Sequence, residues 1–291
     1  MDKPFQFKQF TIEQDRCAMK VGTDGVLLGG WTSLDNSPDA ILDIGAGTGL
    51  IALMLAQRSG ADTVDALEID EAAYEQCVEN FEASPWGDRL FCYHAGLDEF
   101  VEEWDDRYDL IVCNPPFFET PKSAVKGSLP DPPRDNPSVQ SHGDDGSVGE
   151  DADAGAGDEA RLRDDGGEGN DAGIGYESKG SSRQVARFHD SLSFEALVDG
   201  VSQLLARDGI FAVIIPFQAE ENFVALASKK GLYPQRKTRV KGNSTSKTKR
   251  CLLQFGFEET EVYVDGLIIE VERHAYTPDY RALTREFYLN M

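Results

Sequence analysis

Asp43-Ile44-Gly45-Ala46-Gly47-Thr48-Gly49 is the stretch that decides the fold of this chain. It follows an apolar run at 40–44, which predicts a short buried strand, and it leads into residues 50–59, which predict a helix. Glycines suit this place because the chain must turn sharply, and because a backbone without Cβ atoms lets a ligand lie against it. A Gly-x-Gly pattern alone also fits an ordinary tight turn, but the position between a strand and a helix is the context that a cofactor turn requires.

The spacing of the three glycines favours S-adenosylmethionine (SAM) over a dinucleotide. A dinucleotide site usually shows Gly-x-Gly-x-x-Gly, whereas the glycines here alternate with single residues. An acidic residue is expected at the end of the next strand, where it accepts hydrogen bonds from ribose hydroxyls. Glu68 stands there, and Asp70 is the less favoured candidate because it also suits the cap of the following helix. No carboxylate stands at 95–96, so we expect the cofactor adenine to meet backbone and apolar groups at that point.

Beyond the turn, predicted strands and helices alternate along the chain. Strands are predicted at 63–68, 90–93, 110–113 and 210–215 and near 233–240, 251–257 and 262–272, and helices at 71–82, 192–205 (stopping near Asp208-Gly209), 220–230 and 278–288. This alternation predicts an α/β fold with a Rossmann-like, mostly parallel twisted sheet and helices on both faces. Ahead of it, residues 5–19 predict a hairpin extension and residues 23–31 a short helix.

A second motif, Asn114-Pro115-Pro116-Phe117, follows the apolar run at 108–113. A planar exocyclic nitrogen is a poor nucleophile because its lone pair is delocalised, and an enzyme can help by accepting both of its N–H bonds. Asn114 offers a side-chain oxygen and Pro115 a carbonyl that the prolines hold in place. Phe117 can stack on the planar group, with Phe118 completing an apolar wall. The motif therefore predicts methyl transfer to nitrogen, although a strand that ends in a Pro-Pro loop is the plainer alternative.

Charge is distributed unevenly along the chain. The net charge is −24, which by itself disfavours a nucleic-acid partner. Residues 229–257, however, carry nine Lys or Arg and no Asp or Glu. Such segregation is expected of a phosphate-binding face, and a solvated loop that balances the acidic remainder is the alternative.

Residues 119–183 differ in composition from the rest of the chain. They are rich in Gly, Asp, Ser and Pro, with fifteen Asp or Glu against seven Lys or Arg, a net charge of −8. Such a segment cannot bury enough apolar surface to offset its chain entropy, so we predict a disordered acidic insertion. Periodic structure resumes at 188, which places the insertion inside one domain.

Bulk properties narrow the remaining choices. No apolar run approaches the roughly 20 residues of a membrane span, and the N-terminus lacks the pattern of a signal peptide, so a cytoplasmic protein without membrane contact is expected. The five cysteines show no Cys-x-x-Cys spacing and are predicted to be reduced and mostly buried. No metal site is expected. The oligomeric state stays open, with a monomer as the default.

At these motifs the chain resembles class I SAM-dependent methyltransferases that carry Asn-Pro-Pro-Phe. Five stretches are similar to the bacterial valine-tRNA adenine-N6 methyltransferases, which modify the adenosine 3′ of the anticodon, tRNA position 37. These stretches are 5–10, 19–29, 109–118, 186–193 and 280–289. The resemblance covers nearly everything except 119–183, and the insertion is a departure because the family's loop after the motif is short.

The resemblance implies a function and a set of residues. It implies methyl transfer from SAM to adenine N6 in the anticodon region of a tRNA, adenine-37 of tRNA(Val). Residues 1–36 would line the cofactor pocket, and 37–118 with 184–291 would form the methyltransferase domain. Catalysis would fall to Asn114, Pro115 and Phe117. Cofactor contacts are expected from Lys20, Gly22, Thr23, Asp43, Gly45, Gly47, Gly49, Glu68, Asp70 and Asn114. RNA contacts are expected from Phe117, Phe118, Lys237, Arg239, Lys241, Lys247, Lys249 and Arg250.

Three rival functions share the motif or the scaffold. Protein glutamine-N5 methyltransferases use Asn-Pro-Pro-Tyr but carry a helical domain before the glycine turn, and only about forty residues precede Asp43 here. Ribosomal-RNA guanine-N2 methyltransferases show His after Asn-Pro-Pro-Phe, where this chain has Phe118. A non-catalytic interaction protein on a methyltransferase scaffold is the third, and the intact Asn114 and glycine turn argue against it.

Overall fold

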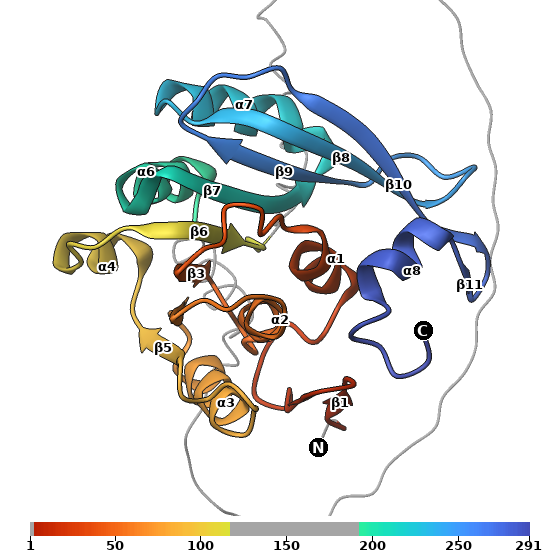
Figure 1. The fold of residues 1–291 in the computed structure, drawn as a ribbon, viewed down its shortest axis with the longest axis horizontal. Coiled ribbons are helices and arrows are strands. Elements are labelled where there is room, and N and C mark those ends of the chain that lie inside the picture. The colour runs from red at the N-terminus through yellow and green to blue at the C-terminus, as the bar shows by residue number, and fades with distance from the viewer. Residues whose placement is uncertain (1–2, 117–191) are drawn as a thin grey trace, which may run out of the picture. The chain divides into compact units, whose positions relative to one another are not determined.

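A nine-stranded sheet organises the part of the chain that the structure describes, residues 3–116 and 192–291 of a computed structural model (Figure 1). The strand order is β11-β10-β8-β9-β7-β6-β3-β4-β5. Strands β5, β4, β3, β6 and β7 are parallel, and β9 is antiparallel to both β7 and β8. A separate two-stranded hairpin, β1 with β2, lies near the N-terminus. The mostly parallel α/β sheet and the N-terminal hairpin are those predicted from the sequence.

The elements have the following bounds. The strands are β1 (Phe5–Gln6), β2 (Thr11–Ile12), β3 (Ala40–Ile44), β4 (Thr63–Glu68), β5 (Leu90–His94), β6 (Tyr108–Cys113), β7 (Leu205–Pro216), β8 (Tyr233–Asn243), β9 (Arg250–Gly256), β10 (Tyr263–Glu272) and β11 (Ala275–Tyr276). The helices are α1 (Thr23–Trp31), α2 (Leu50–Arg58), α3 (Glu71–Glu82), α4 (Leu97–Glu103), α6 (Phe194–Leu204), α7 (Glu220–Lys229) and α8 (Pro278–Thr284), with the 3-10 turn η1 (Phe217–Ala219).

Both faces of the sheet are covered, which explains why its strands are apolar without alternation. Successive side chains of β6 point to opposite faces. Leu110 and Val112 pack in the core that holds α1, α2 and α8, whereas Ile111 and Cys113 pack in the core that holds α4, α6 and α7. All four side chains are fully buried. Figure 1 shows the two groups of helices along the two sides of the sheet.

One local prediction is wrong, and one helix is not predicted. The helix predicted to stop near Asp208-Gly209 ends at Leu204, and β7 begins at the next residue. Tyr108 pairs with Leu205 and Leu110 with Ile210, so the Asp-Gly signal marks an irregularity in the ladder and not a helix end. Helix α4 is not predicted from the sequence, because its N-cap, Gly96, has no side chain to cap it.

The sheet is assembled from both sides of the segment 117–191. Strand β6, which precedes that segment, pairs along its length with β7, which follows it. Because β3, β4, β6 and β7 are parallel, their carboxyl ends meet at one edge of the sheet. That edge carries both the glycine turn and Asn114. The prediction of a disordered insertion lies outside the described residues and stays a prediction.

Candidate active site

The glycine turn between β3 and α2 has the backbone that its sequence predicts. Gly45, Gly47 and Gly49 have φ values of +73°, +56° and +78°, a region that side chains other than glycine rarely adopt. A Cβ atom on Gly45 or Gly47 would find nothing within 4 Å, and both residues line a cavity. A Cβ on Gly49 would lie 2.5 Å from Phe81 Cε1 and 2.9 Å from Cys77 Sγ. The first two glycines thus leave space for a ligand, and the third lets the turn pack on α3.

Glu68 stands at the end of β4, on the wall of the same cavity. Its Oε2 accepts a hydrogen bond from Gly47 N at 2.8 Å, and its Oε1 accepts from Asp70 N at 2.9 Å. Asp70 also lines the cavity, but its Oδ1 accepts from Ala73 N at 3.0 Å and caps α3, as predicted. The carboxylate of Glu68 therefore bridges the glycine turn and the start of α3 on the wall of the cavity.

Asp43 occupies a different environment from the other predicted cofactor residues. Its side chain is fully buried and does not line the cavity. Oδ2 accepts from Ala52 N in α2 at 3.1 Å, and Oδ1 has no hydrogen-bond partner among the described residues. Burial, opposed by the hydrogen bond from Ala52, raises the pKa of Asp43 to about 7. The carboxyl group therefore ties the strand to the helix beneath the turn.

Asn114 and Pro115 lie beside the glycine turn. Cys113, at the end of β6, pairs with Ile44, so the residues that follow each strand are neighbours at the edge of the sheet. Asn114, Pro115 and Pro116 line the cavity together with Gly45 and Gly47. The structure thus brings the two sequence motifs into one site. Phe117 and Phe118 lie outside the described residues, and their predicted stacking role stays a prediction.

The cavity that these residues surround has a volume of about 990 Å³, at the upper end of the range for small-molecule sites. Cys17, Ala18 and Met19 form its N-terminal wall, whereas the predicted Lys20, Gly22 and Thr23 do not line it. Another wall comes from the β5–α4 connection and the start of α4, with Ala95, Gly96, Leu97 and Asp98, where the adenine is expected. Helix α6, whose role was not predicted, contributes Ala196, Asp199, Gly200 and Gln203, together with its N-cap Ser193.

The donors and spaces of this cavity fit SAM. The open positions over Gly45 and Gly47 would accept a ligand against the backbone, and the half-buried Glu68 carboxylate supplies the acceptor that ribose hydroxyls need. Leu67 and Leu97 offer apolar surface, as an adenine ring requires, and the carboxylate of Asp98 also lies on the wall.

The predicted RNA-binding residues divide into two groups. Lys237 and Arg239 on β8 pair with the buried Glu220 of α7, at 3.4 Å and 3.3 Å. Arg250 Nε pairs with Asp24 Oδ2 of α1 at 2.7 Å. These three cations therefore have carboxylate partners within the fold.

Lys241, Lys247 and Lys249 form no ion pair with any described residue, and Lys247 and Lys249 are exposed in the connection between β8 and β9. Pro216, at the end of β7, pairs with Arg250, and Phe217 N donates to Lys249 O at 3.0 Å. The β8–β9 connection is therefore at the same edge of the sheet as Asn114.

Several general findings bear on the site. Among residues 3–116 and 192–291, no group of three or more His, Cys, Asp or Glu is arranged to hold a metal ion. Within the same residues no helix is both long and apolar enough to cross a membrane. All five cysteines are free, and four are buried, as predicted. Burial raises the pKa of Cys17, on the cavity wall, to about 12, so this thiol is protonated at neutral pH.

Comparison with known proteins identifies the family. A model of the methyltransferase small domain matches residues 27–127. The tRNA1(Val) (adenine(37)-N6)-methyltransferase of Flavobacterium johnsoniae is 50% identical over 288 residues, which cover 99% of this chain and all of the relative. The protein of the same name from Christiangramia forsetii is 45% identical and covers 100% of this chain and 99% of the relative.

A solved structure supports the fold independently. A predicted O-methyltransferase, protein Atu636 from Agrobacterium tumefaciens, matches with a TM-score of 0.57 over 91% of this chain and 96% of its own, at 16% identity. Identity over the full length of both chains, together with the two motifs in one cavity, shows that this protein belongs to the tRNA1(Val) (adenine(37)-N6)-methyltransferase family.

Proposed function

We propose that this protein transfers a methyl group from SAM to the exocyclic N6 of an adenine in tRNA, and that the adenine is position 37 of tRNA(Val). The observation that carries the proposal is the placement of Asn114 and the glycine turn on the wall of one cavity. Full-length relatives at 45–50% identity that carry this name support the choice of substrate. An enzyme that acts on tRNA is expected in the cytoplasm.

The chain's own residues hold the cofactor. Bound SAM supplies an electrophilic methyl group on a sulfonium centre. Gly45 and Gly47 let the cofactor lie against the backbone. Glu68 already accepts hydrogen bonds from Gly47 N and Asp70 N, and its remaining lone pairs accept those of the cofactor's ribose hydroxyls. Because Glu68 is fixed by two backbone donors, its acceptor geometry is set before the ligand binds.

Asn114 and Pro115 orient the nitrogen. The Asn114 side-chain oxygen accepts one N–H of the adenine amino group, and the Pro115 carbonyl accepts the other. With both N–H bonds directed to acceptors, the nitrogen lone pair points toward the cofactor. Pro115 and Pro116 restrict the backbone and so hold these acceptors in place. The target base is extruded from its stack to reach them, and Phe117 stacks on its ring.

The β8–β9 connection supplies the phosphate contacts. Lys247 and Lys249 are exposed, and they lie at the edge of the sheet that carries Asn114. An anticodon loop whose base enters the cavity would bring its backbone across this edge. Because phosphate contacts position a nucleic acid without reading its sequence, these lysines set affinity and not the choice of base.

The test is methyl transfer from labelled SAM to a tRNA(Val) transcript by the full chain, followed by nucleoside mass spectrometry. We expect N6-methyladenosine and no transfer to a transcript in which adenine-37 is replaced by guanine. N2-methylguanosine as the product, or equal labelling of the altered transcript, contradicts the proposed substrate. Methylation of protein glutamine in place of RNA contradicts the substrate class.

A variant pair tests the role of Asn114. Asn114→Ala should abolish transfer and leave the dissociation constant of S-adenosylhomocysteine within about threefold, because its acceptor serves the substrate nitrogen. Asn222→Ala, at an exposed position on α7, is the matched control and should keep full activity. Near-normal turnover by Asn114→Ala would show that this side chain does not orient the nitrogen.

A further inference from the structure

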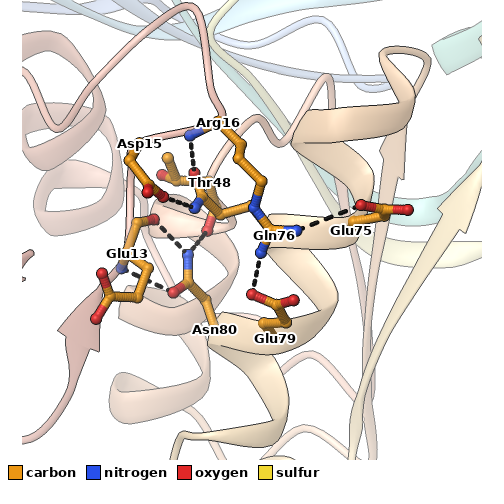
Figure 2. A network of polar contacts seen from close by, with 8 residues as sticks. All are labelled: Glu13, Asp15, Arg16, Thr48, Glu75, Gln76, Glu79 and Asn80. Carbon is orange, nitrogen blue, oxygen red and sulfur yellow. Dashed lines mark hydrogen bonds and ion pairs between the residues drawn. The ribbon is translucent and has the colours of Figure 1, made fainter. Parts of the chain in front are cut away.

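Two side-chain amides on α3 hold the N-terminal segment Glu13–Arg16 against the glycine turn (Figure 2). Gln76 and Asn80 are four residues apart, so they lie on the same face of the helix, one above the other. Both are almost completely buried, with 1% and 2% of their surface exposed. A buried amide is costly unless its hydrogen-bonding groups are satisfied, so the partners of these two residues define what they do.

Asn80 joins the segment to the turn. Its Oδ1 accepts from Glu13 N at 2.8 Å, and its Nδ2 donates to Glu13 O at 2.9 Å, so it pairs with residue 13 as a neighbouring strand would. The same Nδ2 donates its second hydrogen to Thr48 O at 2.9 Å. Thr48 lies between the second and third glycines of the turn. Asn80 thus holds both the glycine turn, which is the floor of the cofactor cavity, and the segment that leads to the N-terminal wall of that cavity.

Gln76 repeats the arrangement one turn earlier on the helix. Its Oε1 accepts from Arg16 N at 3.0 Å, and its Nε2 donates to Asp15 Oδ1 at 2.7 Å. The side chain of Arg16 reaches over the helix to Glu75 and Glu79 (Figure 2). Those two carboxylates are more than half exposed, so their ion pairs contribute little. The buried amides, and not the surface charges, therefore hold the segment.

The next residues after this segment are Cys17, Ala18 and Met19, the N-terminal wall of the cavity. The backbone of residue 16 is fixed by Gln76, so the wall begins directly after an anchored position. We propose that Asn80 and Gln76 are positioning residues for SAM, which hold residues 13–19 over the glycine turn so that the cofactor is enclosed between floor and wall. This inference rests on the proposed function, because it assigns a role at the same cofactor site.

The first arm of the test exchanges amides and carboxylates on one helix. Asn80→Asp and Gln76→Glu keep the shape but place an oxygen where Nδ2 or Nε2 donates. We expect each to raise the KM for SAM about tenfold, with kcat and the KM for tRNA at saturating SAM within about twofold. Glu79→Gln and Glu75→Gln make the opposite change at exposed positions of α3 and should alter none of the three constants. Unfolding midpoints without ligand report whether each variant is folded.

The second arm uses the unaltered full chain and does not depend on any variant folding. Amide hydrogen exchange is followed with and without S-adenosylhomocysteine. We expect the ligand to slow exchange at Glu13, Arg16 and the 17–19 wall by at least tenfold, along with the turn at 45–49. An edge element such as β11 should not respond.

Three outcomes separate this inference from the proposed function. If the ligand protects 45–49 and leaves 13–19 unchanged, the inference is wrong and the cofactor assignment stands. If folded Asn80→Asp and Gln76→Glu keep the wild-type KM for SAM, or lose kcat and not KM, the positioning role is wrong. If S-adenosylhomocysteine binds nowhere on the wild-type chain, the proposed function and the inference both fall.

Discussion

Gly49→Ala separates two reasons for a glycine in the cofactor turn. Gly47 and Gly49 both have positive φ, at +56° and +78°. They differ in their surroundings, because a Cβ on Gly47 meets open space and a Cβ on Gly49 meets Phe81 and Cys77. The same substitution at the two positions therefore isolates the cost of packing from the cost of backbone strain.

The magnitudes follow from these distances. A left-handed backbone costs a residue with a Cβ about 1–2 kcal/mol, and this applies to both variants. At Gly49 the new methyl group would lie 2.5 Å from Phe81 Cε1, and Phe81 is 2% exposed, so the ring has little room to move. Overpacking of a well-packed core adds about 1–3 kcal/mol. We expect Gly49→Ala to reduce the free energy of unfolding by about 2–5 kcal/mol and Gly47→Ala by about 1–2 kcal/mol.

Urea unfolding of both variants and the wild type, with m-values compared, measures this difference. The packing cost is checked by the double variant with Phe81→Leu, which should be less destabilised than the sum of its two single changes. Equal losses for Gly47→Ala and Gly49→Ala, or strict additivity with Phe81→Leu, would refute the reasoning, because Phe81 would then not oppose the methyl group. Gly47→Ala should instead weaken S-adenosylhomocysteine binding, since Gly47 lines the cavity.

Two further predictions concern charge. The double variant Lys247→Gln/Lys249→Gln should weaken tRNA binding, because two phosphates are no longer neutralised. The slope of the log association constant against log salt concentration should fall in magnitude by about 1.4–1.8. The control Arg207→Gln, at an exposed position near the start of β7, should leave the slope unchanged. An unaltered slope in the double variant removes the β8–β9 connection from the tRNA interface. Burial raises the pKa of Asp43 from 3.8 in the unfolded chain to about 7, so the folded state binds more protons between these values and stability is lost as pH rises from about 4 to about 7. The asparagine of the Asp43→Asn variant cannot titrate, so relative to this variant the wild-type free energy of unfolding should fall across this range by at most about 4 kcal/mol. Urea unfolding of both proteins at pH 5 and pH 8 measures this. The same difference in the free energy of unfolding at both pH values contradicts the prediction.

The sequence predicts the floor of the site well because each signal there is local. Positive φ at Gly45, Gly47 and Gly49 follows from the need to turn between strand and helix, and all three have it. The capping role of Asp70 also follows from local chemistry. Asp70 precedes a helix by one residue, and its carboxylate caps that helix, while both Glu68 and Asp70 line the cavity.

The walls of the site are harder to predict because they depend on packing between distant segments. The wall at Cys17–Met19 is expected only from the family resemblance, as part of residues 1–36, and the residues of α6 that line the cavity carry no motif. Gly200 shows why α6 lies where it does. A Cβ at this position would meet the side chain of Leu97 at 2.7 Å, so the glycine allows α6 to approach α4 closely. Such a contact joins residues about a hundred positions apart, and nothing in either local sequence indicates it.

The helical periodicity of α3 alone indicates that the amides of Gln76 and Asn80 are buried. Both lie on the face of α3 that packs inward, where Cys77 and Phe81 are also buried. A buried amide must form hydrogen bonds. Two buried amides one turn apart therefore predict that an extended backbone segment packs against this helix face and hydrogen-bonds to them. The residues that meet them, Glu13 and Arg16, follow the N-terminal hairpin, and their identity depends on the fold and not on the local sequence.

The acid-free stretch at 229–257 shows how charge along a sequence differs from charge in space. Counted in sequence, Lys237 and Arg239 belong to a basic run, but in the fold both face Glu220, a carboxylate 6% exposed that belongs to α7. Arg250 likewise meets Asp24 of α1. Among the described residues, the exposed lysines of this stretch without a carboxylate partner are Lys229, Lys247 and Lys249, and the last two lie beyond the ends of the two strands. A chain of net charge −24 can therefore present positive charge to RNA at one edge of its sheet, because the internal pairs hold that edge in place and Lys247 and Lys249 of the β8–β9 connection remain to attract phosphate.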